Sequence, residues 1–98
     1  MFGLDENTLD GIRKVLKKYA PVEEARIFGS RALGTERPNS DIDLALLGRL
    51  DATLVDRVKS DLDEIPVPYK FDVVGYGLVG HQKLKEHIDR FGKSFYQR

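Results

Sequence analysis

The sequence has 98 residues, of which 41% are hydrophobic and 33% are charged. This length and balance predict one folded domain over residues 1–98 and exclude a disordered chain. The 16 basic and 16 acidic residues cancel, which disfavours a protein held on nucleic acid mainly by its charge. Because cysteine is absent, disulfides and thiolate metal sites are also excluded.

The first residues carry neither a basic segment nor an apolar segment of the signal-peptide type. No stretch approaches the roughly 18–20 apolar residues that a membrane helix needs. Together with the lack of cysteine, this pattern favours a cytoplasmic protein without membrane contact.

Hydrophobic periodicity and turn residues divide the chain into short elements. In chain order, we expect a helix over residues 5–19, a strand over 24–28, a helical turn over 31–33, a loop over 34–40, a strand over 41–47, a helix over 51–65, a strand over 69–74 and a helix over 81–91. This order predicts a small α/β (α+β) domain. Its mixed sheet has three or four strands, and its helices lie mainly on one side.

Two carboxylates interrupt the second predicted strand. Period-two alternation places Asp41 and Asp43 on one face and Ile42, Leu44 and Leu46 on the other. Aspartate is depleted in strands, and two on one face repel each other unless a cation neutralises them. Taken alone, this pattern has a simpler explanation, in which Asp41 belongs to a turn and Asp43 points to solvent.

Two further features favour a cation site. Gly29 and Ser30 follow an apolar strand directly, where glycine permits close backbone approach and the turn presents N–H groups suited to phosphate. Asp72 is another carboxylate inside a strand, with the parity to share a face with Asp41 and Asp43 if the strands are adjacent. Three carboxylates beside a phosphate cradle indicate two-metal phosphoryl transfer.

The spacing of these residues resembles a known signature. Ten residues, Arg31 to Ser40, separate Gly29-Ser30 from Asp41-Ile42-Asp43. This string is similar to the Gly-Ser-x10-Asp-x-Asp motif of the minimal nucleotidyltransferase (MNT) proteins, in the polymerase-beta-like nucleotidyltransferase superfamily. The resemblance covers residues 27–46, and Asp72 matches the third carboxylate by position.

The resemblance implies a nucleotidyltransferase fold and a set of functional residues. Asp41, Asp43 and Asp72 would be catalytic and would bind Mg²⁺, as two ions. Gly29 and Ser30 would bind the triphosphate of ATP, and Arg31 and Ser40 are further nucleotide-binding candidates. Arg31 could equally be a surface residue that closes the turn.

The resemblance also implies a partner. MNT proteins are similar to the antitoxins of HEPN–MNT pairs, in which AMP passes from ATP to a tyrosine of the HEPN ribonuclease toxin. This chain would then form a hetero-oligomer with a HEPN toxin and would not bind nucleic acid directly. Two alternatives stay open: an antitoxin that acts by occlusion alone, and transfer of a nucleotide to a small molecule.

Some residues outside the motif carry weaker expectations. We expect surface roles for His81 and His87, because their spacing does not suit zinc. Phe91, Phe95 and Tyr96 are equally compatible with the core and with a partner-docking patch.

Overall fold

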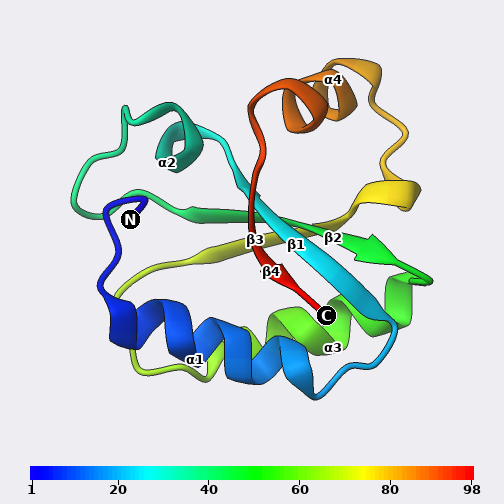
Figure 1. Cartoon of the computed structure of the whole chain (residues 1–98), viewed down its shortest axis with the longest axis horizontal. Coiled ribbons are helices and arrows are strands. Elements are labelled where there is room, and N and C mark those ends of the chain that lie inside the picture. The colour runs from blue at the N-terminus through cyan, green and yellow to red at the C-terminus, as the bar shows by residue number, and fades with distance from the viewer.

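The computed structural model describes all 98 residues (Figure 1). The elements, in chain order, are α1 (Glu6–Lys17), β1 (Val22–Phe28), α2 (Ser30–Leu33), β2 (Ile42–Gly48), α3 (Ala52–Asp63), β3 (Phe71–Gly75), the 3₁₀ helix η1 (Tyr76–Leu78), α4 (Gln82–Phe91) and β4 (Lys93–Gln97). All the predicted helices and strands are present. The structure adds η1 and β4.

The four strands form one mixed sheet in the order β3-β2-β1-β4. β1 pairs antiparallel with both β2 and β4, whereas β2 pairs parallel with β3. The parallel pair requires a crossover connection, which α3 provides. This topology places β2, which contains Asp43 and directly follows Asp41, in the interior of the sheet.

Local signals set the helix boundaries. The Asp5 side chain caps α1 by accepting the N–H of Thr8 at 2.7 Å, and Asp51 caps α3 through the N–H of Leu54 at 2.8 Å. Both helices end about two residues before their predicted ends. In α1, the N–H groups of Lys18 and Tyr19 donate to carbonyls three residues back, so the last turn tightens and leaves the α-helical path.

The main core lies between α1, α3 and one face of the sheet. In Figure 1 these two helices lie together on one side of the sheet, and α4 lies on the other. The odd-even alternation predicted for β2 is confirmed, because Ile42, Leu44 and Leu46 are all fully buried in this core. A smaller cluster of Phe28, Ala45 and Ile88 joins α4 to the opposite face.

The C-terminal strand β4 was not predicted from the sequence. Lys93–Gln97 contains two adjacent aromatic residues, charged and polar neighbours and no regular alternation, so the strand depends on the free edge of β1. Tyr96 is buried in the core, Phe95 packs partly against it, and Phe91 is 38% exposed. The open question about these aromatics is thereby answered for Tyr96, which is a core residue.

None of the helices combines the length and the apolar character needed to cross a bilayer.

Candidate active site

The parallel pairing of β2 and β3 aligns two of the three predicted carboxylates. Asp43 is the register partner of Asp72. The residues flanking them on each strand point into the main core, so both aspartates lie on the opposite face, the one that carries α4. Asp41 immediately precedes β2 and is exposed. The structure therefore brings together carboxylates that are about thirty positions apart in the chain.

The electrostatics of Asp43 follow from this placement. Burial, followed by the negative charges of Asp72 and Asp41, raises the pKa of Asp43 to about 6, and the Arg31 charge opposes that rise. None of the ion pairs in the structure includes Asp41, Asp43 or Asp72. The chain itself thus provides no ion pair to neutralise these carboxylates, and the Arg31 charge offsets their repulsion only in part.

These carboxylates are not closed into a metal cage. No group of three or more His, Cys, Asp or Glu side chains is arranged to hold a metal ion by itself. The oxygen-only donor set is nevertheless the kind that Mg²⁺ prefers, since this ion uses one or two carboxylates and completes its shell with water and phosphate. The residues present therefore fit Mg²⁺ bound jointly with a nucleotide.

The glycine turn lies directly against Asp43. Gly29 follows β1 with φ 70° and ψ −151°, a conformation that favours glycine. A Cβ at this position would overlap Asp43 Oδ2 and lie 3.2 Å from its Cγ. The absence of a side chain at Gly29 therefore allows the turn and the carboxylate to be in contact, as the predicted site requires.

The chain enters a helical turn immediately after Gly29. Ser30 opens α2, and the Gly29 carbonyl accepts the N–H groups of Ala32 and Leu33, both at 3.2 Å. The N–H groups of Ala32 and Leu33 are thereby used within the turn, so the N–H groups of Ser30 and Arg31 are the donors that it can offer to an anion. Gly29 and Ser30 are partly exposed beside Asp43.

Sequence reasoning missed one residue of this region. The Gly29 N–H donates to His87 Nε2 at 3.0 Å, although the two residues lie 58 positions apart. His87 is half-buried on α4, contrary to the surface role predicted for it. No sequence signal could reveal this contact, because it depends on where α4 crosses the sheet. His81, by contrast, is exposed and accepts the N–H of Leu84 through Nδ1, as an N-cap.

Arg31 is not the surface residue of our alternative interpretation, and its predicted contact with nucleotide stays a prediction. Arg31 is only 3% exposed, and its guanidinium donates to the carbonyls of Phe2, Ser40 and Asp41 at 2.9, 2.8 and 3.3 Å. It also stacks over the Tyr69 ring at 4.8 Å. Three of its N–H groups thus donate to backbone carbonyls, and two of these bonds fix the segment that leads into β2.

Ser40 has a similar local engagement. Its Oγ accepts the Arg37 N–H at 2.8 Å, and its own N–H donates to the Arg37 carbonyl at 3.0 Å. These bonds close the loop just before Asp41. The hydroxyl hydrogen is still free to donate, so nucleotide binding by Ser40 stays a prediction.

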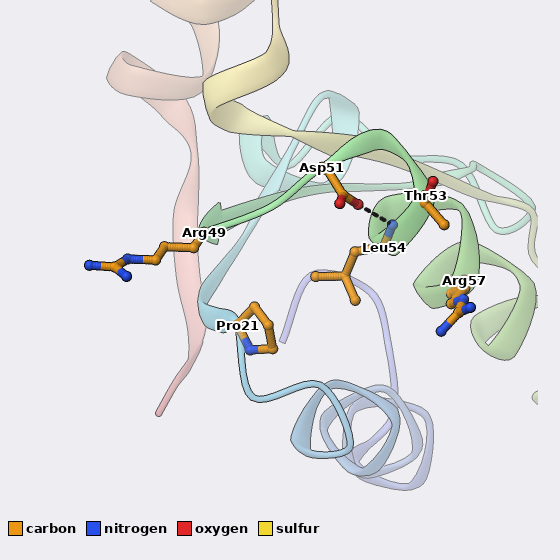
Figure 2. A pocket seen from close by; sticks show the side chains of 6 residues that line it. All are labelled: Pro21, Arg49, Asp51, Thr53, Leu54 and Arg57. Carbon is orange, nitrogen blue, oxygen red and sulfur yellow. Dashed lines mark hydrogen bonds between the residues drawn. The ribbon is translucent and has the colours of Figure 1, made fainter.

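One surface hollow of the molecule lies away from this site. It has a volume of about 280 Å³ and is lined by residues at the far end of β2 and on α3: Pro21, Arg49, Asp51, Thr53, Leu54 and Arg57. Figure 2 shows Arg49 extending away from Arg57, so the two cations do not converge on one anion. This hollow contains none of the predicted site residues.

Comparison with known families identifies the domain. The model of the family described as polymerase beta, nucleotidyltransferase matches residues 10–98. The chain belongs to this family. No curated protein sequence matches this nucleotidyltransferase chain significantly.

Several solved structures with the same fold are toxin–antitoxin complexes. A toxin–antitoxin with AMP-PNP is 27% identical over 97% of this nucleotidyltransferase chain and 75% of its own, with a TM-score of 0.68. The MntA–HepT toxin–antitoxin is 22% identical over 96% and 74%, with a TM-score of 0.72. The MNT antitoxin complex with a tri-AMPylated HEPN toxin of Shewanella oneidensis is 19% identical over 97% and 74%, with a TM-score of 0.73. The two identities below 25% indicate a shared fold.

Proposed function

We propose that this protein is an antitoxin that transfers AMP from ATP to a hydroxyl, by expectation a tyrosine hydroxyl, of a partner HEPN toxin in the cytoplasm. The observation that carries the proposal is the pairing of Asp43 with Asp72 on one sheet face, with the Gly29 turn in contact with Asp43. Carboxylates and a phosphate-binding turn in contact are what a nucleotidyl transfer site requires.

Asp41, Asp43 and Asp72 are the residues that would hold Mg²⁺. When bound, the metal neutralises charge on the phosphates and aligns the attacking hydroxyl with the leaving pyrophosphate. The pKa of Asp43 is raised to about 6 first by burial and then by the negative charges of Asp72 and Asp41, and a bound cation would oppose both effects by favouring the charged carboxylate.

The other residues have positioning and proton-transfer roles in this proposal. The Gly29–Ser30 turn would bind the triphosphate with backbone N–H groups and the Ser30 hydroxyl. Asp72 is exposed and lies beside Asp43, so it could accept the proton of the incoming hydroxyl. Arg31 would act indirectly, by holding the backbone of Ser40 and Asp41 in place.

The similar complexes support the class of partner. One of them was solved with AMP-PNP, a close ATP analogue, and another contains a tri-AMPylated HEPN toxin beside its MNT antitoxin. A hetero-oligomer of this chain with a HEPN toxin is therefore the assembly that we propose.

Labelled ATP tests the proposal directly. The protein is incubated with α-labelled ATP, Mg²⁺ and the toxin encoded beside it, and label on the toxin is followed by mass spectrometry of its peptides. We expect Mg²⁺-dependent AMP on a toxin hydroxyl, lost by at least about a hundredfold in Asp43→Asn and in Asp72→Asn. Asp56→Asn, on the exposed surface of α3, is the matched acidic control and should transfer normally.

Three outcomes would contradict the proposal. Undiminished transfer by Asp43→Asn would rule out this site as the catalytic centre. If that variant loses transfer yet still neutralises the toxin, occlusion suffices and AMP transfer is not the means of neutralisation. Labelling of a small molecule in place of the toxin would instead support the alternative acceptor.

A further inference from the structure

The imidazole of His87 contacts the turn that we expect to bind phosphate. The Gly29 N–H donates to His87 Nε2 at 3.0 Å, and Gly29 itself lies against the Asp43 carboxylate. A backbone N–H can only donate, so Nε2 must be the unprotonated nitrogen and the neutral ring must carry its hydrogen on Nδ1. The contact therefore defines one tautomer of this histidine.

The His87 ring is held in place from several directions. It packs edge-on against Phe28, with ring centroids 6.1 Å apart, and against Phe91 at 5.3 Å. Phe28 is the last residue of β1 and directly precedes Gly29, so the histidine contacts two successive residues where the strand enters the turn.

Helix α4 is itself anchored beside His87. The next residue, Ile88, is completely buried against the sheet. Asp89 then accepts the hydroxyl hydrogen of Tyr76 at 2.6 Å, which joins α4 to η1 at the end of β3. His87 is thus carried by a rigid part of the helix rather than by a mobile surface.

We infer that His87 is a positioning residue, which fixes the Phe28–Gly29 peptide through Nε2 and so holds the phosphate-binding turn against Asp43. The hydrogen bond restricts rotation of that peptide, and Gly29 has no side chain to restrict it otherwise. Its consequence for nucleotide binding rests on the proposed function, whereas the positioning of the turn can be measured without any nucleotide.

Two substitutions separate the hydrogen bond from packing. His87→Leu keeps an apolar side chain against Phe28 and Phe91 but cannot accept a hydrogen bond. His87→Gln keeps an acceptor oxygen at a similar reach. His81→Asn is the matched control on the same helix, since asparagine is also a good N-cap.

Amide hydrogen exchange tests the positioning role on the complete chain at pH 7.5. Exchange of the Gly29 N–H should accelerate by up to about tenfold in His87→Leu, and it should stay near the wild-type rate in His87→Gln and His81→Asn. Equal exchange in the Leu variant and the wild type would overturn the inference. Should His87→Leu fail to fold, NMR of the wild-type imidazole decides: an unprotonated Nε2 supports the contact, and a protonated Nε2 overturns it.

Nucleotide kinetics test the consequence. In the toxin-labelling reaction, the KM for ATP should rise about three- to tenfold in His87→Leu, with a smaller change in kcat and with recovery in His87→Gln. Tighter ATP binding by His87→Leu would show that the imidazole competes with phosphate and would overturn a positioning role. If the wild type transfers no AMP at all, the proposed function fails, and the exchange data still decide the role of His87.

Discussion

At the residue scale, the site depends on a glycine with two separate requirements. Gly29 has a positive φ, and its missing side chain leaves room for the Asp43 carboxylate. Gly34 has nearly the same φ, 76°, but nothing within 4 Å of a Cβ added there. Substitutions at these two glycines therefore distinguish the cost of backbone strain, which both positions share, from the cost of steric overlap, which arises only at Gly29.

We predict different outcomes for alanine at these two positions. Gly34→Ala should cost about 1–2 kcal/mol, because only the left-handed conformation is strained. Gly29→Ala should cost about 3 kcal/mol or more and should abolish Mg²⁺-dependent ATP binding, because its methyl group displaces Asp43. Urea denaturation and titration calorimetry measure these effects. Comparable losses of ATP binding in both variants would contradict a direct contact between the turn and the carboxylate.

Asp43 predicts a pH-dependent stability difference. Its pKa is higher in the folded chain, about 6, than the 3.8 of a free carboxyl, so folding favours the protonated form. The stability associated with that proton is fully present below about pH 4 and is lost as the pH rises through about 6. The shift corresponds to about 3 kcal/mol at full burial, and partial solvent exposure reduces our expectation to about 1–2 kcal/mol.

Asp43→Asn should therefore be more stable than the wild type at pH 7.5 by about 1–2 kcal/mol, with the difference shrinking toward pH 4. Thermal unfolding at several pH values in a chelating buffer measures it. Adding Mg²⁺ with ATP should stabilise the wild type and leave the variant unchanged. A stability difference that is constant with pH would contradict the raised pKa.

At the element scale, β4 adds a fourth strand to the sheet and pairs with the edge of β1 that the other strands leave unpaired. It covers the outer edge of β1, the strand that leads directly into Gly29. Within β4, the Tyr96 side chain is buried in the core at 6% exposure, whereas its neighbour Gln97 is exposed. The C-terminal segment thus supports the strand from which the phosphate-binding turn departs.

Tyr96→Ala should destabilise the protein by about 3 kcal/mol, because it removes a buried aromatic ring from the core. Gln97→Ala, on the same strand, should change stability by less than about 0.5 kcal/mol. Chemical denaturation of both variants provides the comparison. If Tyr96→Ala unfolds at the wild-type denaturant concentration, the aromatic ring does not contribute to the core.

At the scale of the whole molecule, one arginine joins distant parts of the chain. Arg31 bonds the backbone at Phe2 and at Ser40–Asp41, and it stacks on Tyr69, which precedes β3. The N-terminus, the loop before β2 and the segment before β3 therefore share one buried guanidinium. Loss of this group should increase the mobility of the backbone at Asp41 and should lower the stability of the fold.

Arg31→Lys should cost about 2–4 kcal/mol, since an ammonium group cannot reproduce the planar fork that reaches three carbonyls. It should also weaken Mg²⁺-dependent ATP binding, because Asp41 is no longer held. Arg37→Lys, an exposed substitution in the loop between α2 and β2, is the control and should have little effect on either property. Unchanged stability of Arg31→Lys would show that the three backbone contacts contribute little.

Much of the fold follows from local patterns in the sequence. The apolar stripes, the Asp5 and Asp51 caps and the alternation in residues 41–47 predict three helices and three strands, because these signals act within a few residues. The strand at Lys93–Gln97 has no such signal, and it forms because β1 offers an unpaired edge. Helices α1 and α3 end about two residues before their predicted ends, because 3₁₀ hydrogen bonds tighten their last turns.

The chemical character of the site was determined by the sequence by itself: two aspartates in a strand, a Gly-Ser turn and a third strand carboxylate. Only the tertiary structure decided that Asp72 pairs with Asp43, that Arg31 is a buried backbone clamp, and that His87 reaches the Gly29 N–H. Sequence periodicity determines which face a side chain takes, because it reflects local backbone geometry. Contacts between segments depend on strand order and helix crossing, which are settled by packing of the whole core.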